Sequence, residues 1–175
     1  MSNIHYRITS IEAADIWPPD DVKTYLRVAH NRDDRLIGNL TKSAIISAEQ
    51  FLGLCLFTRK ITCTIEKAPA TFRPKYIPIL RVNTIHHVKG EGARDDIEGS
   101  FGHISSGSDQ IIFDPKYHGA KVEITYDAGF GERIPSTITQ GILLQIAAMY
   151  DLGDSSGAVQ AEMRQMYMPY RSLKL

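Results

Sequence analysis

The side chains best suited to chemistry are histidines in the middle of the chain, and their spacing does not assemble a site. His86 and His87 are adjacent on a predicted strand, so their rings point to opposite faces and cannot share a metal ion. A zinc site would need His103 or His118 to converge on one of them, and no Cys or His pair has the spacing of metal ligands. Exposed or interfacial histidines are the favoured interpretation, and we predict no metal site.

Two glycine-containing stretches do not have the pattern of a nucleotide-binding loop. Segment 90–99 (GEGARDDIEG) carries acids where a phosphate-binding loop needs backbone amides and a lysine. Segment 127–132 (DAGFGE) lacks the third glycine of a dinucleotide-binding loop, and a turn with positive φ explains it better. Asp95, Asp96 and Glu98 do not follow the alternating oxygen spacing of a calcium-binding loop. We therefore predict no cofactor.

The remaining acids, thiols and hydroxyls also favour structural roles. The acidic pairs at 20–21 and 33–34 precede predicted helices, where acids cap backbone donors and complement the helix dipole. Cys55 and Cys63 are interpreted as small buried side chains, with a disulfide between them as the less favoured alternative. No serine lies in a nucleophile elbow. The chain is predicted not to be an enzyme, although an active site assembled only in three dimensions stays open as an alternative.

Apolar periodicity then predicts the elements. A stripe at three- and four-residue steps predicts a core-facing helix that Gly53 ends in a left-handed conformation. After residue 54 the period changes to two, which is typical of half-buried strands. Pro135 is expected to begin a further helix. The stripe consists of Leu36, Ile37, Leu40, Ala44, Ala48, Phe51 and Leu52.

These elements predict a single α+β domain over residues 1–175. We expect an N-terminal arm at 1–19 with one short strand around 5–8, helices at 20–53, a β-strand-rich insertion at 54–130, helices at 134–166 and an extended C-terminal arm at 167–175. The core is expected to be mainly helical, made by two N-terminal helices and a C-terminal helix. Strands bracketed by helices argue against a doubly wound nucleotide-binding fold.

Composition limits the partners. Lys+Arg and Asp+Glu number 20 each, so the formal net charge is zero and no overall basic field attracts nucleic acid. No apolar run approaches the ~20 residues that span a bilayer, and residues 1–7 contain no hydrophobic signal core. These features predict a protein without membrane contacts that is made and retained in a cytoplasm.

Two stretches resemble the head–tail connector (adaptor) family of tailed bacteriophages, of the portal-proximal ring type. Residues 21–37 (DVKTYLRVAHNRDDRLI), continuing to Gly53, resemble its opening helix, acids and long helix. Residues 122–150 resemble its last strand, glycine turn, proline and helix, and 168–175 (MPYRSLKL) resemble its closing element. The sequence departs from the family at His30, where an acid is usual, and segment 68–119 does not align in detail.

The resemblance implies a structural subunit of a ring, expected to be dodecameric, below the portal of a virion. Such a ring extends the DNA channel, DNA passes through it without sequence-specific binding, and its lower face docks a head-closure or tail protein. Assembly is expected in the bacterial host cytoplasm, from an active phage, a defective prophage or a gene transfer particle. The alternatives are another morphogenesis protein, of the head-closure or tail-terminator kind, or a small enzyme.

The resemblance also implies that the C-terminal arm grips the portal protein. A short apolar and basic tail gains order by docking on a partner, whereas a tail folded on its own domain is the alternative. The residues that would carry this contact are Tyr167, Tyr170, Arg171, Leu173, Lys174 and Leu175.

Overall fold

The computed structural model describes residues 3–11, 17, 19–97, 101–102, 109–131, 133–151 and 157–172. Contacts divide the chain into two compact units. A strand unit combines the N-terminal segment with Phe57–Gly131, and a helical unit combines Ala14–Leu56 with Glu132–Leu175. The predicted α+β class is confirmed, because each unit is built almost wholly from one kind of element.

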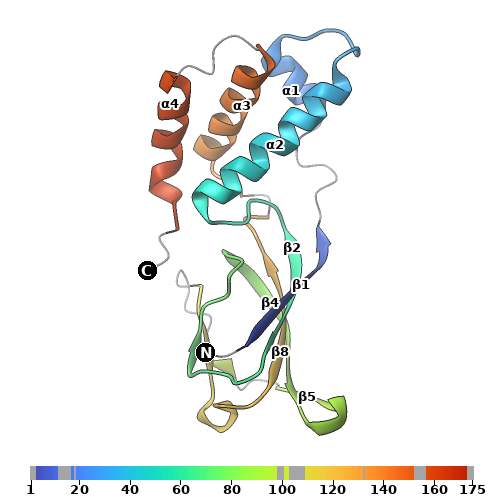
Figure 1. Cartoon of the computed structure of the whole chain (residues 1–175), viewed down its shortest axis with the longest axis vertical. Coiled ribbons are helices and arrows are strands. Elements are labelled where there is room, and N and C mark those ends of the chain that lie inside the picture. Colours follow the sequence, from blue (N-terminus) through green and yellow to red (C-terminus); the bar gives the residue numbers. More distant parts are fainter. Residues whose placement is uncertain are drawn as a thin grey trace. The chain divides into compact units, whose positions relative to one another are not determined.

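The strand unit contains two antiparallel sheets (Figure 1). The larger sheet has the order β1-β2-β8-β4-β5, and a smaller sheet has the order β3-β7-β6. The larger sheet comprises β1 (Ile4–Ile11), β2 (Arg59–Ile65), β8 (Val122–Ala128), β4 (Ile79–Val88) and β5 (Arg94–Asp96). The smaller sheet comprises β3 (Thr71–Phe72), β7 (Ile111–Phe113) and β6 (Phe101–Gly102), and the turns η1 (Gly90–Gly92) and η2 (Pro115–Tyr117) are 3-10.

Alternation along β2 and β8 separates an apolar face of the larger sheet from a polar one. Cys63 lies opposite Ile124 in the register, and both side chains are fully buried. On the other face, the hydroxyl of Thr62 lies 3.3 Å from that of Thr9 and 3.4 Å from that of Thr125. One apolar face and one polar face are the pattern of an antiparallel sheet that covers its core on one side.

The strand expected around 5–8 in the predicted N-terminal arm is present, but it is longer than predicted and belongs to the larger sheet. Residues Ile4–Ile11 form β1, which pairs along its length with β2. Tyr6 anchors this strand, because its hydroxyl accepts a hydrogen bond of 3.0 Å from the backbone N–H of Lys75. The strands are therefore not confined to an insertion at 54–130, since the sheet takes its first strand from the beginning of the chain.

The helical unit contains α1 (Pro19–Leu26), α2 (Asp34–Leu52), α3 (Ser136–Tyr150) and α4 (Gly157–Tyr167), followed by the 3-10 turn η3 (Met168–Tyr170). Helix α3 is central, with α1, α2 and α4 all packed on it (Figure 1). Its residues Ile138, Ile142 and Ile146 are fully buried. None of the described helices is both long and apolar enough to cross a membrane.

Helix α2 largely follows its sequence pattern. Gly53 has φ of +69° and donates its N–H to the carbonyl of Glu49, which confirms the predicted left-handed end. Leu36 does not belong to the core stripe, because 46% of its surface is exposed. Ile45 is buried in the core instead, so the buried face of α2 is rotated slightly from the predicted one.

Candidate interaction surfaces

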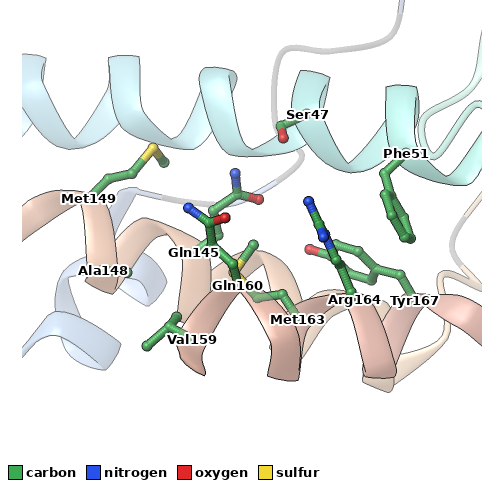
Figure 2. Close-up of a pocket in the computed structure, with 10 residues that line it drawn as sticks. All are labelled: Ser47, Phe51, Gln145, Ala148, Met149, Val159, Gln160, Met163, Arg164 and Tyr167. Atoms are coloured by element: carbon green, nitrogen blue, oxygen red, sulfur yellow. The ribbon is translucent and has the colours of Figure 1, made fainter. Parts of the chain in front are cut away.

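A groove lies between α2, α3 and α4 in the helical unit (Figure 2). The last residue of α4, Tyr167, approaches Phe51 of α2 with ring centroids 6.0 Å apart. The remaining space between the helices has a volume of about 380 Å³. Its apolar lining comes from all three helices and consists of Phe51, Ala148, Met149, Val159 and Met163.

The groove also contains polar groups without partners. The hydroxyl of Tyr167 and Oε1 of Gln145 are both buried and have no hydrogen-bond partner among the described residues. Burial raises the pKa of Tyr167, so its hydroxyl stays protonated and can donate a hydrogen bond. Arg164 lines the groove with an exposed side chain and forms no ion pair with any residue that the structure describes. A guanidinium without an ion pair at the surface of the groove favours an occupant with a negative charge.

Gly141 of α3 lies directly against the ring of Tyr167, which lines the groove. A Cβ atom at Gly141 would lie 2.6 Å from Cε1 of Tyr167, which is closer than real Cβ contacts. The ring of Tyr167 therefore rests directly on the backbone of α3, where any other residue type would displace it. Only 2% of Tyr167 is exposed. This contact attaches the C-terminal end of α4 to α3.

The predicted C-terminal arm is wrong in its first residues. Tyr167 ends α4 and belongs to the core of its own unit, and Met168–Tyr170 form a 3-10 turn rather than an extended segment. Arg171 is exposed, with its guanidinium 5.2 Å from the ring centroid of Phe51. The N–H of Ser172 donates to the carbonyl of Leu52 at 2.8 Å. Tyr170 is half-buried, and Leu173, Lys174 and Leu175 lie outside the described residues.

The acids at 33–34 connect helices rather than cap one. Asp33 precedes α2 but makes no side-chain cap hydrogen bond, which contradicts the predicted capping role. Its carboxylate accepts a hydrogen bond of 2.5 Å from the hydroxyl of Tyr150, and this bond raises the pKa of Tyr150. Asp34 pairs at 2.9 Å with the buried ammonium of Lys23, which also donates to Asn31. These contacts give both acids structural partners within the helical unit.

The histidines and cysteines do not converge. His86 Nδ1 lies 2.6 Å from Asp96 Oδ1, and His87 packs edge-on against the ring of Tyr117. No group of three metal-ligating side chains exists among the described residues; His103 and Glu98 lie outside them. Cys55 and Cys63 are both buried, and no disulfide joins them.

The strand-to-helix turn after β8 has the positive φ values that its glycines predicted. Gly129 has φ of +132°, and a Cβ there would lie 2.7 Å from the carbonyl oxygen of Phe57. Asp127 is buried, and it accepts hydrogen bonds of 2.7 Å from Arg81 and 2.9 Å from Asn83. The segment is therefore a structural turn with a supporting ion pair.

Comparison with known proteins identifies a fold. No protein-family model and no curated protein matches the sequence. Among solved structures, the fold of the chain is similar to that of chains in the necks of particles.

The particular likeness is to chains of gene transfer agent particles. A chain in the neck of an empty particle, computed with C6 symmetry, aligns with a TM-score of 0.80 at 16% identity over 98% of this chain and 97% of that chain. A chain in the virion of a native particle aligns with a TM-score of 0.79 at 16% identity over 97% and 96%. A chain in a native neck, computed with C12 symmetry, aligns with a TM-score of 0.69 at 18% identity over 100% and 97%. The likeness shows a shared fold over essentially the whole of both chains.

Proposed function

We propose that the chain is a non-catalytic structural subunit of a head–tail connector. Copies assemble side by side as a ring below the portal, extend the DNA channel, and present a face on which further connector or tail proteins dock. The observation that carries this proposal is the full-length fold likeness to a chain in the neck of a gene transfer agent particle, with a TM-score of 0.80. A likeness to these neck chains over only part of the chain, or over only one of its two units, would not support this proposal.

The symmetry of the similar particles supports a ring. Two of the neck structures were computed with sixfold and twelvefold symmetry, so their chains recur around an axis. A ring of identical copies uses two different surfaces on each chain, one for each neighbour. A twelvefold ring also agrees with the dodecamer expected from the sequence resemblance.

The charge of the chain suits a channel that DNA traverses. The formal net charge is zero, from 20 basic and 20 acidic residues. Each phosphate neutralised by Lys or Arg releases counterions and adds to affinity, so a strongly basic wall would hold DNA in place. A neutral subunit lets the genome pass.

The contact with the portal is assigned to the C-terminal end, with a changed boundary. Tyr167 is excluded as an anchor because it is buried in its own unit. Tyr170 and Arg171 are the accessible described residues of the predicted set, and Leu173–Leu175 complete it. Arg171 contributes a donor for carboxylates or carbonyls of the portal surface.

Removal of the gene from a producing genome tests the function. Without this subunit, we expect DNA-filled heads and free tails that do not join, and complementation with the wild-type gene should restore tailed particles. Electron microscopy of the particles, with a count of tailed and tailless heads, provides the measurement. Normal yields of tailed particles from the deletion strain would refute the proposal.

A further inference from the structure

We propose that the groove between α2, α3 and α4 receives helix α1 of a second copy of this chain. In this contact Tyr25 faces the two groove methionines and Asp21 pairs with Arg164. The inference rests on the proposed ring and adds the surfaces through which neighbouring copies meet.

The groove has the chemistry of a docking surface with one preferred charge. Met149 and Met163 supply flexible apolar walls that adapt to an aromatic partner. Arg164 is the only charged side chain in the described lining, and no described residue neutralises it. An occupant that offers an acid and an aromatic ring would match both the guanidinium and the methionines.

Helix α1 presents those groups on its outer side. Asp20 and Asp21 lie exposed in its first turn, and no described residue forms an ion pair with either carboxylate. Tyr25 follows Asp21 by four residues, so the two side chains lie on one face of the helix. Tyr25 is 37% exposed, and its hydroxyl accepts a hydrogen bond of 3.1 Å from Gln140, which holds the ring in place.

The placement of the two surfaces suits a ring. Helices α1 and α4 pack on different sides of α3, as Figure 1 shows. A contact between α1 of one copy and the α2–α4 side of the next is heterologous, because the two surfaces differ. Repetition of such a contact in one direction closes a ring when the rotation allows it. A small apolar molecule in the groove would leave the acids of α1 and the charge of Arg164 unpaired.

Charge exchange between the two surfaces tests the proposal. We expect Asp21→Lys and Arg164→Glu each to weaken self-association about tenfold or more, because each places like charges at the contact. Combining the two substitutions restores opposite charges and should bring association back to within about threefold of the wild type. Lys42→Glu changes an exposed charge on α2 outside the groove lining and should leave association unchanged. Sedimentation velocity of the full chain measures association, and circular dichroism verifies that each variant is folded.

Crosslinking provides a second measurement. Tyr25→Cys combined with Met163→Cys should give a ladder of disulfide-linked copies under mild oxidation, whereas Lys42→Cys combined with Met163→Cys should not. Rings that form equally well in the wild type and both single charge variants, with no ladder, would refute the α1 contact and leave the proposed function intact. A wild-type chain that forms no ring, alone or on its portal, would refute the proposed function and this inference together.

Discussion

Substitution of Gly141 tests whether the ring of Tyr167 determines how α4 is attached. Glycine in a helix interior costs about 1 kcal/mol relative to alanine, so Gly→Ala at an open helical position stabilises. At Gly141 the added Cβ would lie 2.6 Å from the buried ring. Overpacking of this kind costs about 1–3 kcal/mol, and the ring cannot move freely because Phe51 lies on another side. We expect Gly141→Ala to lower the free energy of unfolding by about 1–2 kcal/mol.

Gly38 provides the matched control. It lies in α2, and a Cβ there would meet nothing within 4 Å. Gly38→Ala should raise the free energy of unfolding by about 0.5–1 kcal/mol. For a chain of this length the two variants should differ in melting temperature by roughly 3–12 °C, which differential scanning calorimetry resolves.

A double substitution separates the clash from other effects of the methyl group. Tyr167→Leu removes the ring, so adding Gly141→Ala to it should cost far less than Gly141→Ala costs alone. The two substitutions should therefore couple by about 1 kcal/mol or more, as contacting residues do. Equal stabilisation by Gly141→Ala and Gly38→Ala, with no coupling to Tyr167→Leu, would show that the ring does not rest on α3.

Three further predictions concern the ion pair, the buried thiol and the C-terminal end. Asp127→Ala should lower the free energy of unfolding in urea by about 2–4 kcal/mol, because it removes two charge-assisted hydrogen bonds from a buried site. Arg81→Ala changes the exposed partner of the ion pair and should cost less. Equal costs for the two substitutions would contradict the buried role of Asp127. Burial raises the pKa of the Cys63 thiol to about 12, whereas the pKa of a thiol in the unfolded chain is about 8.5. The folded state therefore holds this proton more tightly, so the unfolding free energy should be constant below about pH 8.5 and fall between pH 8.5 and 10.5; a constant value across that interval would refute the assignment. Deletion of 173–175 should leave the melting temperature unchanged and abolish portal binding in a pull-down. Deletion from Tyr167 onwards should also unfold the helical unit. Full portal binding by the shorter deletion would refute the arm assignment.

The sequence alone predicted the elements whose stability is local or periodic. The long helix, its left-handed end at Gly53 and the alternating strand around Cys63 depend on side-chain spacing and backbone preference, which are visible in the residues themselves. Strand β1 was predicted too short, and its pairing was not predicted, because it lies at the sheet edge, where both of its faces stay largely exposed. Such a strand has little apolar contrast between its faces, although Ile4, Tyr6 and Ile8 do alternate.

The groove could not have been predicted in the same way. Its lining comes from three helices, and its shape depends on a residue that has no side chain. A weak signal existed, because Gly141 stands inside an otherwise strong helix pattern, where glycine needs a packing reason. Its partner Tyr167 was assigned to the arm, since nothing in the linear pattern shows that a tyrosine 26 positions later folds back onto α3.

The segment that carried the family resemblance acts through structure rather than through a site. Within 21–37, Lys23 is buried and is held by Asn31 and Asp34, and Asp33 receives the hydroxyl of Tyr150 from α3. These polar contacts determine how α1 is placed against α2 and α3. A resemblance in such residues therefore predicts a shared fold, and it is compatible with an identity of only 16% to a neck chain over 98% of this chain.

In the proposed ring, specificity for neighbouring copies must then reside in surfaces that the shared fold leaves free to vary. The exposed acids of α1 and the guanidinium of Arg164 are such surfaces, because neither is needed for a contact within the described part of the chain. A charge pair at the edge of an interface affects partner choice and association rate more than it affects stability. Charge reversal at Asp21 or Arg164 should therefore change assembly while the melting temperature stays the same. A variant that loses both together would indicate that these side chains support the fold itself.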